Sequence, residues 1–315
     1  MTLRAVIAGT GGYLPARVLS NDGLAEAYGL DTSDAWIVER TGIRQRHMVA
    51  DGETVSDMAA EAARKALAQA GSEVAEVDAV ILATATPDAV FPSTATRVQA
   101  KLGITRGYSF DISAACTGFI YALGVADAMV RAGQARGVLV IGAEAFTRLL
   151  DWTDRTTCVL FGDGAGAVFL RASDVAGQRG ILSTHLHSDG RHGDILQVEQ
   201  GLFRMAGREV FRHAVSKLAS AVDEALAANA LKQEDVHWLV PHQANLRIIE
   251  AMGRKLGLPP ERVVVTVDRH ANTSAASIPL ALAEATRDGR IGEGDLVLME
   301  AIGGGLTWGA ALARF

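Results

Sequence analysis

Short apolar runs alternate with longer amphipathic segments along most of the chain. Residues 77–83 and 138–142 are almost continuously apolar, which is typical of strands buried on both faces of a parallel sheet. Residues 54–70 repeat apolar side chains with the period of a helix, and Gly71 follows as an end signal. This alternation predicts an α/β fold built from repeated strand–helix units.

The order of these elements occurs twice. Strands are predicted over residues 107–111, 236–240, 262–268 and 295–300, and helices over residues 209–229, 246–256 and 273–288. Cys116 and Asn272 each stand in a strand-to-helix turn, and they precede the helix-ending Gly133 and Gly289 by the same number of residues. The match indicates an internal duplication, with halves over residues 1–172 and 173–315 and two mainly parallel sheets packed through shared helices.

Two glycine-rich clusters were tested as nucleotide-binding loops. The strand that begins at Arg4 is predicted to turn at residues 9–15, where Leu14 occupies the third glycine position of a dinucleotide fingerprint. The second cluster, residues 162–166, is predicted to separate strands over residues 158–161 and 167–170 and does not open a helix. Neither cluster therefore predicts a phosphate cradle.

Composition narrows the possible partners. The chain has 315 residues, a formal net charge of -6 and 5% aromatic side chains, which argues against nucleic acid as a partner. Cys116 and Cys158 form no CxxC pair or Cys/His ligand set, so no disulfide framework and no metal are expected. The N-terminal residues show no leader pattern, and the longest uncharged apolar stretch, residues 112–126, is too short for a membrane helix. We therefore expect a cytoplasmic protein that does not bind membranes.

Three polar side chains follow predicted strand ends: Cys116, His242 and Asn272. Because ligands gather at the carboxyl ends of parallel strands, these side chains are placed where they can converge. Taken singly, each has an ordinary alternative: a cysteine packed as a small hydrophobe, a structural loop histidine, and a turn or helix-cap asparagine. Cys116 also stands at a helix start, where free N–H groups favour a thiolate, so we expect a more acidic thiol.

Together the three residues fit one chemistry. A cysteine thiolate forms a thioester by attacking an acyl donor. His242 and Asn272 can both donate hydrogen bonds to the carbonyl oxygen of a second thioester, which would stabilise the enolate formed when a malonyl-type thioester loses carbon dioxide. The glycine run at residues 303–305 can bring a backbone N–H close to the acyl oxygen. A Cys–His protease is disfavoured because no protease signature surrounds Cys116.

Seven motifs cover nearly the whole chain: WIVERTGIR from Trp36, DISAACTGF from Asp111, FGDGAG from Phe161, MAGREVF from Met205, PHQANLR from Pro241, HANTS from His270 and GGGLTWG from Gly303. In this order they resemble the β-ketoacyl-acyl-carrier-protein synthases III. The resemblance implies a thiolase-like fold, an internally duplicated five-layer αβαβα architecture, and a Cys116–His242–Asn272 triad. The related elongating synthases use two histidines, so Asn272 points to the initiating class.

The activity that this resemblance implies is a decarboxylative Claisen condensation. A short acyl-coenzyme A, such as acetyl-coenzyme A, would be joined to malonyl-acyl-carrier protein to give a 3-ketoacyl-acyl-carrier protein, which initiates fatty acid biosynthesis. Acyl-coenzyme A would be a substrate, with no permanently bound cofactor and no metal.

The resemblance also implies roles for further residues. The backbone N–H groups of Cys116 and Gly304 would form the oxyanion hole. Coenzyme A would be held by Trp36, Arg40, Arg155, Gly207 and Asn245. The acidic carrier protein would meet a basic patch made of Arg212, Arg247, Arg254 and Lys255. The acyl pocket would be shaped by Phe91, reaching across a homodimer interface, and by Ile302 and Leu306, which stand where many relatives have phenylalanine.

Two alternatives stay open at the level of sequence. A same-fold enzyme could prime a polyketide or another specialised acyl product. A non-catalytic partner subunit is disfavoured, because such a chain is expected to lose Cys116 or His242 and both are present.

Overall fold

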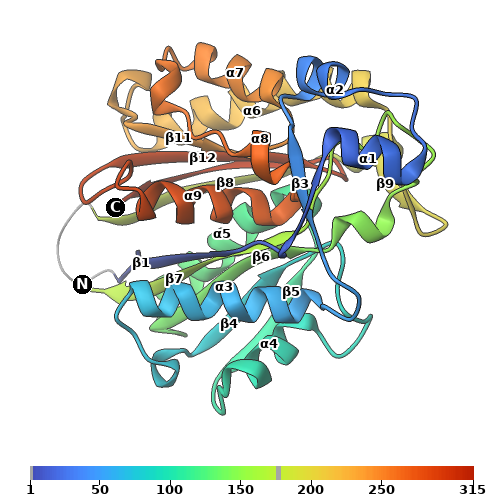
Figure 1. Cartoon of the computed structure of the whole chain (residues 1–315). Helices are drawn as coiled ribbons and strands as arrows, with labels where there is room; N and C mark the ends of the chain where they lie inside the picture. Colours follow the sequence, from blue (N-terminus) through green and yellow to red (C-terminus); the bar gives the residue numbers. More distant parts are fainter. Residues whose placement is uncertain (1–2, 175–178) are drawn as a thin grey trace.

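The computed structural model describes residues 3–174 and 179–315, and it contains five layers (Figure 1). Figure 1 shows two sheets stacked one above the other, with one layer of helices between them and one helical layer on each outer side. This is the αβαβα arrangement that the family resemblance implied.

The first sheet has five strands in the order β1-β7-β6-β4-β5. They span β1 Arg4–Tyr13, β4 Ala79–Ala83, β5 Tyr108–Ile112, β6 Gly137–Glu144 and β7 Gly164–Ser173. Strand β4 is parallel to β5 and β6, while β7 is antiparallel to both β6 and β1. Two helices cover its outer face, α3 Val55–Gln69 and α4 Thr94–Leu102.

The second sheet has four strands in the order β11-β12-β13-β8. They span β8 Gly180–Ser188, β11 Trp238–Pro241, β12 Leu296–Gly303 and β13 Thr307–Arg314, with α6 Gly207–Ala228 and α7 Leu246–Lys255 outside. Its one parallel pairing joins β11 to β12. The prediction of mainly parallel sheets is therefore wrong, because each half closes with antiparallel neighbours after a short parallel unit.

The central layer consists of two helices, α5 Gly118–Arg131 and α9 Ser277–Arg287. Apolar side chains of both helices, among them Phe119 and Leu123 of α5 and Leu282 of α9, pack against apolar side chains of the two sheets. A helix buried on most sides is expected to be apolar around its circumference. This explains why residues 112–126 read as a long uncharged stretch without being a membrane segment.

The first glycine cluster forms no turn. Strand β1 continues through it and packs closely on helix α3. Glycine is needed for this approach, because a Cβ atom on Gly11 would lie 2.2 Å from the carbonyl oxygen of Ala62. The second cluster likewise lies within and just before β7, and the predicted strand at residues 158–161 is a turn. These glycines permit close backbone packing.

The predicted strand at residues 262–268 is reduced to a single parallel bridge between Val263 and Leu239 of β11. Val264 reaches β11 through one hydrogen bond to Leu239, and helix α8, Val267–His270, begins soon afterwards. The side-chain oxygen of Gln243 accepts the N–H groups of Thr266 and Val267, which takes the place of a strand partner.

Two further sheets have two strands each. Strands β2 Arg17–Ser20 and β3 Gln45–Met48 enclose helices α1 Asn21–Tyr28 and α2 Asp34–Thr41, and β9 Leu196–Glu199 pairs with β10 Leu202–Met205. Across the described ranges, no helix combines the length and apolar character needed to cross a membrane.

Candidate active site

A cavity of about 730 Å³ draws its lining from both halves of the chain, and it contains Cys116, His242 and Asn272. Cys116 lies in a short 3-10 turn, Ala115–Thr117, directly before α5. His242 follows the last residue of β11. Asn272 lies between α8 and a second 3-10 turn, Ser274–Ala276, which leads into α9. The fold thus brings together the three side chains that the sequence singled out.

The turn that carries Cys116 is held against the end of β12. Ala115 adopts a positive φ of 46°, which is unusual for a residue with a side chain. A Cβ atom on Gly303 would lie 2.7 Å from the backbone nitrogen of Cys116, so only glycine allows this approach. Gly304 follows and also lines the cavity, which puts the two backbone N–H groups expected to form the oxyanion hole on adjoining segments.

The Cys116 thiol is less acidic than predicted. Burial raises its pKa to about 12, the negative charge of Glu144 adds to the increase, and the Ser274 hydroxyl opposes it without reversing it. The expectation of an acidic thiol is therefore wrong for Cys116 in this structure. The reason is that the loss of hydration outweighs the effect of the helix start.

His242 is buried and neutral. Its backbone N–H donates to the carbonyl oxygen of Glu300 (2.8 Å), and its ring atom Nδ1 lies 2.7 Å from Oγ of Ser277. Burial lowers the pKa of the imidazole to about 3, so it carries no charge near pH 7. Sequence reasoning missed Ser277, although it lies only five residues after Asn272.

Asn272 is oriented by its neighbours. Its Oδ1 accepts the N–H of Ser274 at 2.9 Å, which directs the side-chain NH2 group away from that contact and toward the cavity. Its backbone also exchanges hydrogen bonds with Leu160 and Gly162, so the glycine-rich FGDGAG motif holds this turn in place.

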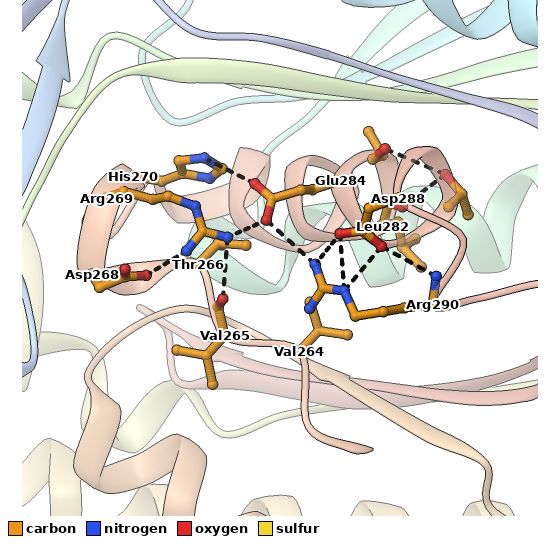
Figure 2. A network of polar contacts seen from close by, with 12 residues as sticks. Val264, Val265, Thr266, Asp268, Arg269, His270, Leu282, Glu284, Asp288 and Arg290 are labelled. Carbon is orange, nitrogen blue, oxygen red and sulfur yellow. Dashed lines mark hydrogen bonds and ion pairs between the residues drawn. The ribbon is translucent and has the colours of Figure 1, made fainter. Parts of the chain in front are cut away.

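A network of charges fixes the segment just before Asn272 (Figure 2). Figure 2 shows Glu284 of α9 between Arg269 and Arg290, and both arginines interact with its carboxylate. Arg269 also contacts Asp268 at 2.8 Å, and Nε2 of His270 lies 3.5 Å from the same glutamate. The end of α8 is therefore tied to α9, which stabilises the backbone that leads into Asn272.

Most residues expected to bind coenzyme A line the same cavity: Trp36, Arg40, Gly207 and Asn245. Arg155 lies outside the lining, but its guanidinium carbon is 5.3 Å from the centre of the Trp36 ring, and that of Arg40 is 4.8 Å away. Asn245 donates to the carbonyl oxygen of Arg40 and caps helix α7. The two arginines and the indole therefore form one positively charged aromatic edge.

The expected acyl-pocket residues are divided. Ile302 lines the cavity, Leu306 is fully buried in the core without lining it, and Phe91 projects from the surface with 84% of its area exposed. The phenylalanines that do line the cavity are Phe146, Phe161, Phe203 and Phe211, and the sequence assigned none of them to the acyl pocket. Phe146 and Phe161 stack with ring centres 4.1 Å apart. Phe161 and Phe211 belong to the FGDGAG and MAGREVF motifs, whereas nothing in the local sequence marked Phe146 and Phe203.

The expected carrier-protein patch lies on α6 and α7. All four of its residues, Arg212, Arg247, Arg254 and Lys255, are exposed. Three of them have an acidic neighbour 3.7–4.0 Å away, in the pairs Arg212–Glu209, Arg254–Glu250 and Lys255–Asp223. Arg247 instead donates to the backbone oxygen of Glu39. Exposed pairs of this kind are weak and can be exchanged for a partner's carboxylates.

The described part of the chain contains no group of three or more histidine, cysteine or acidic side chains placed to hold a metal ion. Both cysteines are free and buried.

Known proteins resemble this chain along its full length. Models of 3-oxoacyl-[acyl-carrier-protein] synthase III match residues 110–190, and the C-terminal model of the same family matches residues 226–315. A β-ketoacyl-[acyl-carrier-protein] synthase III of Acidiphilium cryptum is 65% identical and covers 99% of both chains. One of Rhodospirillum centenum is 64% identical and covers 100% of both.

Solved structures give the same result. The 3-oxoacyl-[acyl-carrier-protein] synthase III of Aquifex aeolicus superposes with a TM-score of 0.95 at 49% identity, covering 99% of this chain and 100% of that one. A priming β-ketosynthase of the R1128 polyketide pathway superposes with a TM-score of 0.92 at 36% identity, covering 99% and 96%. The chain therefore belongs to the β-ketoacyl-[acyl-carrier-protein] synthase III family.

Proposed function

We propose that Cys116 carries the acyl group in the reaction of this family, in which an acyl-coenzyme A condenses with malonyl-acyl-carrier protein to initiate fatty acid synthesis. The supporting observation is that Cys116, His242 and Asn272 line one cavity. The sulfur of Cys116 attacks the acyl carbonyl, the bond between acyl carbon and coenzyme A sulfur breaks, and the thiol proton ends on coenzyme A. Backbone N–H groups of Cys116 and Gly304 hold the oxyanion.

The second half-reaction uses the two donors. When the malonyl group loses carbon dioxide, the electron pair of the broken C–C bond moves toward the thioester oxygen, where His242 and Asn272 donate hydrogen bonds. The resulting carbanion attacks the acyl carbon on Cys116, and sulfur leaves and is reprotonated. The neutral state of His242 supports this role, because burial lowers its pKa to about 3.

Trp36 and Arg155 would bracket the adenine of coenzyme A, and Arg40, Gly207 and Asn245 would line the channel for its phosphates and pantetheine. Both guanidinium groups lie over the indole ring, which supports a base-stacking site there, and Arg155 would move away from Trp36 to admit the adenine. The carrier protein would bind at Arg212, Arg247, Arg254 and Lys255, where its carboxylates would replace the present acidic neighbours.

The chain would act as a cytoplasmic homodimer. Val90 and Phe91 form an exposed apolar tip, with 98% and 84% of their areas accessible, which is unusual for a free surface and suits insertion into a second subunit. Sedimentation of the wild-type chain and of Phe91→Asp would test this; a parent that sediments as a monomer would exclude the assignment.

Intact-mass measurement tests the acyl carrier directly. After mixing with acetyl-coenzyme A, the parent should gain one acetyl group, and Cys116→Ser should gain none. An adduct that persists in the variant would remove Cys116 from its role. The same measurement with a series of acyl-coenzyme A donors separates a fatty acid initiator, which should prefer short donors, from a polyketide-priming enzyme with other starters.

A further inference from the structure

The imidazole of His242 meets a buried hydroxyl at its ring atom Nδ1. Oγ of Ser277, the first residue of α9, lies 2.7 Å from Nδ1, and only 2% of Ser277 is exposed. We propose that Ser277 is a positioning residue that fixes His242 as the Nε2–H tautomer, so that an N–H group and not a lone pair faces the substrate. This inference rests on the role proposed above for His242.

The direction of the hydrogen bond follows from the neighbours of the hydroxyl. A serine oxygen has one hydrogen to donate and two lone pairs to accept with. The backbone N–H of Gln243 donates to Oγ of Ser277 at 3.3 Å, which uses one lone pair. Within residues 3–174 and 179–315, the other polar contact of this oxygen is with Nδ1, so we infer that the hydroxyl hydrogen is donated to Nδ1. Since Nδ1 accepts, the single hydrogen of the neutral ring is on Nε2.

The backbone around His242 is held rigidly, which prevents the ring from finding another partner. The next residue, Gln243, is fully buried and uses both ends of its amide. Its Oε1 accepts two backbone N–H groups at 2.8 and 3.1 Å, and its Nε2 donates to the carbonyl oxygens of Pro241 and Val264 at 2.8 and 3.1 Å. Such a saturated amide fixes the loop as firmly as secondary structure.

Like His242, Asn272 is held so that it presents a hydrogen-bond donor to the cavity. Its oxygen is occupied by the N–H of Ser274, so its NH2 group is the end offered to the cavity. An enolate oxygen would then meet two donors, one from each side chain. With the opposite tautomer, His242 would turn a lone pair toward the same oxygen and repel the developing charge.

Nitrogen-15 NMR of histidine-labelled protein reports the tautomer directly, and the parent should show His242 protonated at Nε2. In Ser277→Ala, Nδ1 loses its donor and both tautomers should be populated. Release of carbon dioxide from malonyl-acyl-carrier protein should then fall about 10-fold or more, while acylation of Cys116 falls much less. Ser277→Thr keeps the hydroxyl and should restore the parental tautomer.

Ser56→Ala is the matched control, because Ser56 is equally buried in the first turn of α3 and should leave both steps unchanged. An Nδ1–H tautomer in the parent would overturn the inference even if Ser277→Ala failed to fold, and so would parental carbon dioxide release by a folded Ser277→Ala. His242→Ala separates the two proposals. If it keeps decarboxylation, the role of His242 fails; if it loses decarboxylation while Ser277→Ala keeps it, only the role of Ser277 fails.

Discussion

The two halves of the chain build the same local structure for opposite purposes. In each half, a residue with positive φ, Ala115 or Ser274, opens a 3-10 turn that runs directly into a buried central helix. The first turn holds a sulfur nucleophile. The second turn, through Ser274, orients an amide donor, and the helix that follows it begins with the hydroxyl that contacts His242. One framework therefore supplies both the attacking group and the groups that stabilise the charge.

The strand ends cross between the halves. The end of β12 approaches the Cys116 turn at Gly303, and the end of β6 approaches the second turn at Gly142, where a Cβ atom would lie 2.1 Å from the carbonyl oxygen of Ala275. Each half thus supports the chemistry of the other. We propose that the halves divide between residues 172 and 173, one residue before the end of β7; the next strand, β8, belongs to the second sheet.

Replacing the amide donor of Asn272 with a carboxylate should have the largest effect on the reaction. In Asn272→Asp, one carboxylate oxygen can still accept the N–H of Ser274, but the other presents negative charge to the enolate. Decarboxylation should fall about 10²- to 10³-fold, while acylation of Cys116 falls far less. Single-turnover carbon dioxide release and intact-mass measurement follow the two steps separately. Asn272→His retains an N–H donor and should be less impaired; equal loss in both variants would argue against the donor role.

The glycine crossings predict the next effect. Gly303→Ala should displace the backbone of Cys116 and slow acylation about 10-fold or more, because an oxyanion donor moves. Gly142→Ala should instead displace the second turn, slow decarboxylation more than acylation, and destabilise the fold by roughly 1–3 kcal/mol. Gly292→Ala is the control, since no atom lies within 4 Å of its Cβ position. If both crossing variants slowed the same step, the division of labour would be wrong.

Apolar periodicity and strand ends are local signals, so the sequence predicted two sheets packed through shared helices and the three convergent side chains, while the five-layer order came from the family resemblance. It did not predict that β1 passes through its glycines, since these glycines are needed for packing against α3, a helix more than fifty residues away in the sequence. It matched Cys116 with Asn272 by counting back from the helix ends. If the two turns are instead aligned on their positive-φ residues, Ala115 and Ser274, then Cys116 corresponds to Ala275. The two alignments differ because α5 has 14 residues and α9 has 11, so counting back from the helix ends shifts the match. Ser277 escaped notice for a similar reason: only the folded chain brings it to His242.

Two buried glutamates, Glu144 on β6 and Glu300 on the corresponding strand β12, predict the smallest effect, which is on the pH dependence of stability. Glu144 accepts hydrogen bonds from Thr86 and Ala85, whereas Oε2 of Glu300 has no partner among the described residues. Burial raises the pKa of Glu144 to about 7 and that of Glu300 to about 8. A carboxyl whose pKa is raised in the folded state stabilises the fold most below pH 4.5, and this contribution is lost as pH rises toward the folded pKa.

Glu300→Gln should therefore reduce the loss of stability between pH 5.5 and pH 8.5 by about 3 kcal/mol. Glutamine keeps the shape of the side chain but cannot ionise, so the stability of the variant increases relative to that of the parent as pH rises. Glu144→Gln should instead lose stability at both pH values, because the donors of Thr86 and Ala85 then face an amide NH2 group. Urea unfolding at the two pH values measures both effects. An unchanged pH dependence in Glu300→Gln would mean that this carboxyl does not ionise in the folded chain over that range.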